Sequence, residues 1–403
     1  MTLPQIKYLL PSPNGYVLAD ELLCQAPMRL TRCEAGLAHA PSLSYGQYFK
    51  GITGVISKDG YRLLVDATAR QQERDISLAD IEEILIYAEK HGSDYHPARI
   101  EVMVGDVCVP FVMNVGVTAR GRARLCNEFD VLQHLGRKYD FPFLPRAYFY
   151  GEASCSSEHN GEADTSLPMF LADWFEGYHE FHLSVDREDG SQGLVLWDTD
   201  KGHYHLRPSH SSQIYRQAAR ILTLYYDVET FEQIFPWHHA AGDFIVRAAE
   251  ESLDVRLVTA RQYGSMMDRS EGVSAHEGLL FFLLNLSLRM RLDRLDGVGA
   301  VAWADDGCLD ATLQGFLEGL RVHERKGMID TGFVEDFVKQ CGSVTKGDLS
   351  ERFHALIDAC DQAAPDMPVI RGHLKRHISR FHSAFQGLED SRFLTTARPE
   401  TTL

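Results

Sequence analysis

The chain has 403 residues, of which 44% are hydrophobic and 24% are charged, a composition typical of a folded globular protein. Its formal net charge of −17 disfavours non-specific binding to nucleic acid or to an anionic membrane surface. We therefore expect neither nucleic acid nor membrane as a partner.

The start of the chain, MTLPQIKYLL, lacks the charged and apolar regions of a secretory signal peptide. The longest apolar run, residues 278–288, is about half as long as the ~20 residues that a membrane span needs. The eight cysteines are scattered without a C-x-x-C pair, which is the usage of a reducing compartment. These features predict a cytoplasmic protein.

Residues 1–95 are predicted to form an N-terminal extension with short strands and one helix. GVISKDGYRLLVDA (54–67) suggests two short strands around a Lys-Asp-Gly turn. Residues 77–92 predict a helix, because Ser77 suits an N-cap, acidic residues follow in the first turn, and Gly92 suits a stop.

Residues 96–177 are predicted to form a strand-rich lobe. Alternating apolar residues on both sides of Gly105-Asp106 predict a hairpin over 98–118, and the apolar spacing of 123–139 predicts a helix. PRAYFYGEA and PMFLADWFEG predict two further strands, separated by a polar surface loop over 153–167.

Residues 178–403 are predicted to form a helical lobe with a few hairpins. We expect hairpins over 193–206 and around 243–260, and helices over 211–227 and most of 275–385. Strands gathered in the first half and helices in the second predict an α+β fold in two lobes, with a boundary near 174–181.

The segment FPWHHAAGDFIV (235–246) joins two histidines, a bend of small residues and an aspartate to an apolar strand. A helix precedes it, and a short hairpin and a variable segment follow. This order resembles the protein-kinase-like superfamily, in particular its aminoglycoside-phosphotransferase and choline-kinase-like branch. The resemblance covers residues 98–300, with 235–261 in the place of the catalytic loop and the metal-binding segment.

The resemblance implies a two-lobed kinase-like fold and a phosphotransferase-type, nucleotide-binding protein that acts on an unknown small molecule or protein. The implied cofactors are ATP or another nucleotide with Mg²⁺. By position, His238 takes the place of the catalytic aspartate and Asp243 that of a metal-binding asparagine. Thr259 stands at the later metal-binding aspartate, and Asn114 at the lysine of the hairpin.

The remaining candidate residues follow from the same resemblance. Glu128 matches the helix glutamate that orients the lysine, and Asp173 lies in the linker strand that would meet an adenine ring. A guanidinium binds oxyanions bidentately, so candidate phosphate clamps are Arg122, Arg124 and Arg261. His238 is a candidate general base, because histidine titrates near neutral pH, and His239 completes the candidate catalytic set.

Several alternatives stay open. The replaced lysine and aspartates are also what a pseudokinase-like scaffold or regulatory binding protein would show. A metal-dependent hydrolase could use His238, His239 and Asp243, whose side chains have ligand chemistry. In a purely structural interpretation the histidines cap a buried turn that Asp243 closes, with Gly242 at a positive φ. Glu128 would then be an exposed helix charge beside Arg124, and Arg122 and Arg124 a solvated basic turn.

Overall fold

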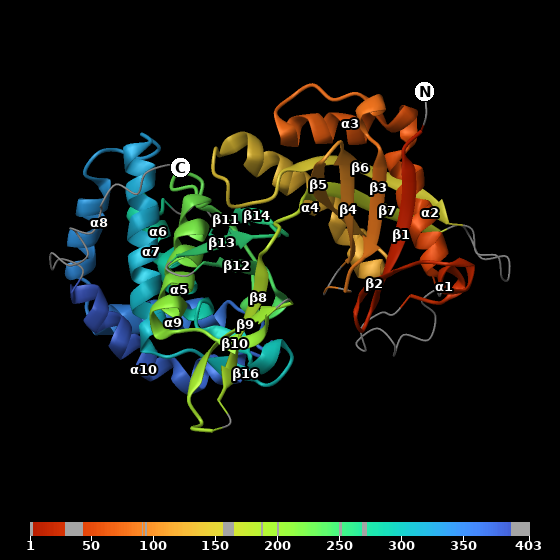
Figure 1. Cartoon of the computed structure of the whole chain (residues 1–403). Helices are drawn as coiled ribbons and strands as arrows, with labels where there is room; N and C mark the ends of the chain where they lie inside the picture. The colour runs from red at the N-terminus through yellow and green to blue at the C-terminus, as the bar shows by residue number, and fades with distance from the viewer. Residues whose placement is uncertain are drawn as a thin grey trace. The chain divides into compact units, whose positions relative to one another are not determined.

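The computed structural model describes residues 3–28, 43–90, 92, 95–155, 165–186, 188–199, 201–249, 252–267 and 272–387. The chain divides into two compact units, one of residues 1–140 and 145–176, the other of residues 141–144 and 177–403. The first unit is rich in strands and the second carries most of the helices (Figure 1). The predicted α+β class is therefore confirmed.

The first unit is built on one mixed sheet, whose described strands follow the order β2-β1-β3-β4-β5-β7-β6. The strands are β1 (Gln5–Ser12), β2 (Gly15–Leu18), β3 (Glu83–Ala88), β4 (His96–Val104), β5 (Val107–Val115), β6 (Ala147–Cys155) and β7 (Thr165–Asp173). β1 and β3 are parallel, and the other neighbouring pairs are antiparallel. The helices are α1 (Glu21–Gln25), α2 (Tyr45–Ile56), α3 (Lys58–Gln72) and α4 (Ala119–Lys138).

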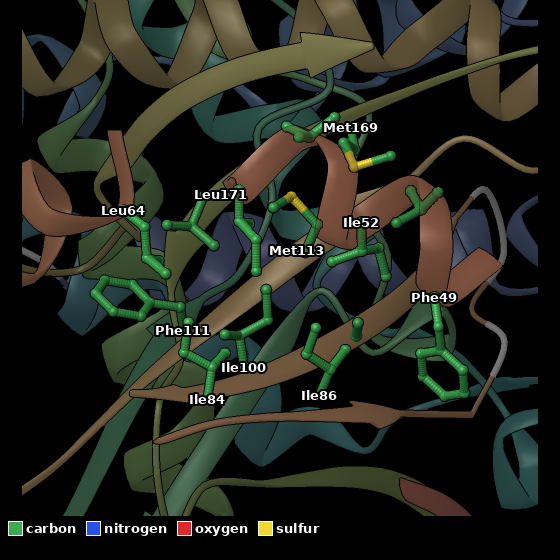
Figure 2. Packing of buried hydrophobic residues seen from close by; sticks show 14 of the residues in the cluster. Phe49, Ile52, Leu64, Ile84, Ile86, Ile100, Phe111, Met113, Met169 and Leu171 are labelled. Carbon is green, nitrogen blue, oxygen red and sulfur yellow. The ribbon is translucent and has the colours of Figure 1, made fainter. Parts of the chain in front are cut away.

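The core of this unit lies between one face of the sheet and the helices α2 and α3 (Figure 2). Alternate residues of a strand point to the same face, which is why the apolar residues gather there. The side chains that meet are Phe49 and Ile52 of α2, Leu64 of α3, and Ile84, Ile86, Ile100, Phe111, Met113, Met169 and Leu171 of the strands.

The predicted elements of residues 98–177 are confirmed. β4 and β5 pair in register from Val104↔Val107 to His96↔Val115, which is the hairpin around Gly105-Asp106. The predicted helix is α4, which begins after the N-cap Thr118. β6 and β7 are the two further strands, and they extend into both ends of the predicted loop. Residues 156–164 of that loop lie outside the described residues.

The prediction of two strands over 54–67 is wrong. These residues belong to α2 and α3, and α2 begins at a capping box formed by Ser44 and Gln47. The Lys-Asp-Gly sequence does turn the chain, because Asp59, Gly60 and Tyr61 have positive φ. The turn joins two helices whose buried residues recur at helical spacing, so the sheet receives no strands from this segment.

The prediction of a helix over 77–92 is also wrong. Ser77 does act as a cap, since its backbone N–H and its hydroxyl both donate to Asp80, but it caps a single 3₁₀ turn, Leu78–Asp80. The chain then enters β3, where buried and half-buried residues alternate. Pairing with β1 on one side and β4 on the other outweighs the acidic residues that favoured a helix.

The expected boundary between an N-terminal extension and a separate lobe at residue 95 is not present. β1, β2 and β3 belong to the same sheet as β4 to β7, and residues 1–140 fall into one compact unit. The second expected boundary, at 177/178, lies one residue from the observed division at Glu176/Gly177.

The second unit contains a sheet of order β10-β9-β8-β12-β13, formed by β8 (His179–Val185), β9 (Gln192–Asp198), β10 (Gly202–His205), β12 (Phe244–Ala248) and β13 (Leu253–Leu257). β11 (Glu232–Ile234) pairs with β14 (Tyr263–Ser265), and β15 (Leu292–Arg294) pairs with β16 (Val301–Trp303). The helices are α5 (Pro208–Leu224), α6 (Ala275–Arg289), α7 (Asp306–Arg325), α8 (Phe333–Gly342), α9 (Lys346–Asp358) and α10 (Met367–Gln386). The hairpins and helices predicted for this part are confirmed.

The helices α5 and α7 pack closely along their lengths (Figure 1). Gly315 and Gly319 of α7 face α5, where a Cβ built on Gly315 would lie 1.9 Å from the carbonyl oxygen of Arg216. Two glycines one helical turn apart thus let the two backbones approach. Across the described residues, the helices are too short or too polar to cross a membrane.

Candidate functional site

The loop between β11 and β12 carries the segment 235–246, and both of its ends are held by strand pairing. β11 pairs with β14, while β12 pairs with β13 and β8. Within the loop, His239–Ala241 form one 3₁₀ turn that ends at Gly242 with φ of 67°. The positive φ of Gly242 favours glycine, and a Cβ here would also have to displace the Glu180 carboxylate, which would lie 2.8 Å away.

Asp243 is the buried centre of the loop, with 1% of its surface exposed. Its carboxylate accepts two hydrogen bonds from the Arg261 guanidinium, at 2.6 Å to each oxygen. The same carboxylate accepts the backbone N–H of His238 at 2.8 Å, and the Asp243 carbonyl accepts that of Val258 at 2.8 Å. Asp243 therefore closes the turn, as the structural interpretation predicted, and it neutralises Arg261.

The two histidines of the loop have different surroundings. Part of the His238 side chain is exposed to solvent. Desolvation of the ring by its surroundings nevertheless lowers its pKa, and the negative charge of Asp243 opposes this shift. His239 is buried among Phe181, Tyr215, Trp237 and Phe244, and burial lowers its pKa to about 4. Its Nε2 lies 3.2 Å from the sulfur of Met290. His239 is thus a neutral core residue, whereas the His238 ring is accessible.

The two other candidates from this unit lie after β13. Arg261, with 13% of its side chain exposed, binds Asp243 as described, and Thr259 is buried. Asp254 on β13 accepts a hydrogen bond from the Tyr178 hydroxyl and lies 2.9 Å from Arg256. The structure therefore brings His238, Asp243 and Arg261 together, and it assigns Asp254 to a separate ion pair.

In the first unit, Glu128 is buried, with 2% exposed, so the alternative of an exposed helix charge is wrong. Its carboxylate accepts a hydrogen bond of 2.6 Å from the Tyr95 hydroxyl. Asn114 lies on β5, half-buried, on the face opposite to the core residues Met113 and Val115.

Arg122 and Arg124 lie in the first two turns of α4. Arg122 is half-buried and donates to the Val117 carbonyl at 2.9 Å, while Arg124 is exposed. Asp173 accepts from the Arg146 backbone N–H at 2.9 Å and from the Tyr148 hydroxyl at 2.5 Å. Burial raises the pKa of Asp173, and these hydrogen bonds oppose that effect. Asp173 thus ties the end of β7 to β6.

One cluster of titratable residues was not predicted. His182 on β8 is 2% exposed and lies between Asp293, with 3.5 Å from Nδ1 to Oδ1, and Glu180, with 3.5 Å from Nε2 to Oε2. Burial opposes a charge on His182, but the two carboxylates outweigh it and raise its pKa to about 9. The only sequence signal was the GYHEFH pattern, which places Glu180 and His182 on one face of a strand.

The residues of this loop do not fit the Mg²⁺ ion that the kinase resemblance implies. Mg²⁺ needs carboxylate oxygens in octahedral geometry, but both oxygens of Asp243 are occupied by Arg261 in the interior. Over the described ranges, no group of three His, Cys, Asp or Glu side chains is placed to hold a metal ion. The hydrolase alternative is disfavoured as well, because His239 is buried against the aromatic ring of Phe244.

No protein-family model and no curated protein sequence matches this chain.

Proposed function

We propose that this chain is a non-catalytic binding protein whose elements follow the order of the kinase-like superfamily. In chain order these are a hairpin (β4–β5), a helix (α4) and two strands (β6 and β7). After the further strands β8 to β10 come a helix (α5), the strand β11, a loop, a short hairpin (β12–β13) and a variable segment. The presence of all these elements in this order supports the kinase-like part of the proposal. The chemistry of the loop supports the non-catalytic part.

The observation that carries the proposal is the bidentate pair of Asp243 and Arg261. Phosphoryl transfer relies on metal ions and positive charge at the phosphate oxygens and on a group that positions the nucleophile. In this loop the carboxylate that would hold the metal is 1% exposed and already neutralised by a guanidinium. Asn114 in place of a lysine removes a second group that such a reaction uses.

A nucleotide is the ligand that this proposal favours, bound without a metal ion. Arg122 and Arg124 lie at the N-terminal end of α4, where backbone N–H groups and the helix dipole favour an anion. A guanidinium can bind phosphate oxygens bidentately, and it does not need a cation as a bridge. A phosphate group at the start of α4 would therefore replace the usual metal-nucleotide complex.

The test is a thermal-shift titration of the full chain with ATP, once with Mg²⁺ and once with EDTA. We expect the same stabilisation in both, which at 100 times the Kd corresponds to about 2.7 kcal/mol. Arg124→Gln should remove most of this shift. Arg137→Gln, at the opposite end of the same helix, should retain it and serves as the matched control.

Release of the γ-phosphate of ATP should be measured on the same samples. The proposal predicts no release above that of buffer with Mg²⁺. A Mg²⁺-dependent release that Asp243→Ala abolishes would overturn it and would restore the phosphotransferase. Absence of any shift with nucleotides would overturn the nucleotide as ligand and would favour a scaffold for another partner.

A further inference from the structure

His182 connects three separate parts of the second unit. It lies on β8, its Nδ1 faces Asp293 of β15, and its ring contacts Trp197 of β9 edge-on, with 4.5 Å between ring centroids. The turn between β15 and β16 covers the ring from a further side, because a Cβ on Gly297 would lie 3.0 Å from the His182 Nε2. Gly297, with φ of 71°, is the residue that allows this approach.

Asp293 is fixed as the buried acceptor of this cluster. One carboxylate oxygen accepts the backbone N–H of Leu183 at 2.8 Å, and the other accepts that of Arg294 at 2.7 Å. Asp293 therefore joins β8 to the start of the turn. A charged imidazole beside it offsets the cost of burying its negative charge.

The turn that this cluster holds is exposed at its tip. Leu295–Gly297 form a 3₁₀ turn, and the Arg294 side chain donates to the Gly299 carbonyl at 3.2 Å. Val298, at the tip, is 85% exposed, so the turn has little apolar packing of its own there. The base of this turn also lies next to the 3₁₀ turn His239–Ala241, which belongs to the loop 235–246 between β11 and β12. The turn 295–300 and the loop 235–246 are therefore neighbours.

We propose that protonated His182 stabilises the contact of the turn 295–300 with β8, and that the turn opens when His182 loses this proton. With the proton present, one positive ring lies between two carboxylates. Without it, Glu180 and Asp293 both face a neutral ring, and the buried Asp293 loses its counter-charge. Neither Asp243 nor a nucleotide takes part in this change, which is independent of the proposed function.

The charged and titratable groups that face the ring within the described part of the chain are few. They are Glu180 from β8, Asp293 from β15, and His239 from the candidate loop, which is neutral because of its low pKa. β9 contributes the uncharged Trp197, and the turn contributes Gly297. Glu180 and Asp293 are therefore the groups that favour the protonated form of His182.

The pH dependence follows from the folded pKa of about 9, which lies above the ordinary histidine value of 6.5. Protonated His182 stabilises the closed turn fully at a pH below the ordinary histidine pKa. This stabilisation is lost as the pH rises through about 9. Between these two pH values, the equilibrium constant for closing the turn should fall about tenfold per pH unit.

The experiment is hydrogen exchange of residues 292–303 in the full chain from pH 7 to pH 10, corrected for the intrinsic chemical rate. We expect the protection of this segment to fall with pH relative to α7, and His182→Gln to show the low protection already at pH 7. Equal loss of protection with pH in wild type and His182→Gln would overturn the proposal, as would unchanged protection in the wild type.

Glu180→Gln provides a second variant at a partly exposed side chain, where misfolding is a smaller concern. It removes one of the two carboxylates, so the midpoint of release should move to lower pH. A midpoint unchanged from the wild type would contradict the role of the two acids.

Discussion

Arg261→Leu should destabilise the second unit by about 3–5 kcal/mol, because it leaves the Asp243 carboxylate buried without a counter-charge. Urea unfolding followed by tryptophan fluorescence is a suitable measurement, since Trp197, Trp237 and Trp303 all lie in this unit. The double variant Asp243→Asn/Arg261→Leu should lose less than the single variant, because no buried charge then remains.

Arg247→Leu is the matched control for this prediction. Arg247 also pairs with an aspartate, Asp254, at 3.6 Å, but 56% of its side chain is exposed. A surface pair of this kind contributes about 1 kcal/mol or less. Equal small losses for Arg247→Leu and Arg261→Leu would contradict the description of Asp243 as a buried, neutralised carboxylate.

Gly315→Ala should destabilise the same unit by about 3 kcal/mol or more. The added methyl group would lie 1.9 Å from the Arg216 carbonyl oxygen and 3.0 Å from the Arg220 nitrogen. Both atoms belong to the backbone of α5, which cannot turn aside as a flexible side chain does. The two helices must therefore separate, and overpacking of this kind costs stability.

Gly372→Ala distinguishes this steric effect from the general preference of helices for alanine. Gly372 lies inside α10 of the same unit, and a Cβ there meets no atom within 4 Å. This substitution should stabilise the protein by about 1 kcal/mol. If Gly315→Ala stabilised the unit to a similar extent, the close approach of α5 and α7 would be wrong.

Local patterns were sufficient where one face of an element is buried and its turn residues are characteristic. The hairpin 98–118 alternates along both strands, and the helix after Thr118 carries its apolar residues at helical spacing. The segment 77–92 was misassigned because its acidic residues resemble a first helical turn. Its alternating residues Ile84, Ile86 and Ala88 become decisive only when β1 and β4 flank them.

The sequence predicted several residues of the candidate site but not the contacts between them. Asp243 and Arg261 were both selected, yet as a metal ligand and a phosphate clamp, whereas they bind each other. The contact between Asp243 and Arg261 depends on how the chain returns from β13 to the loop. The spacing of residues along the sequence gives no information about that path. The pair of His182 and Asp293 joins residues 111 positions apart. GYHEFH draws attention to His182, but no pattern in the sequence around Asp293 indicates that the two residues meet.

The most direct measurement of the central claim is a Mn²⁺ titration of wild type and Asp243→Asn by electron paramagnetic resonance, each with and without ATP. Mn²⁺ takes the oxygen ligands that Mg²⁺ takes, and its signal reports the free ion. Because Arg261 occupies the Asp243 carboxylate, we predict that both proteins bind the same number of Mn²⁺ ions under each condition. One additional Mn²⁺ bound by the wild type, and lost in a folded Asp243→Asn protein, would contradict the account and support a metal-dependent phosphotransferase.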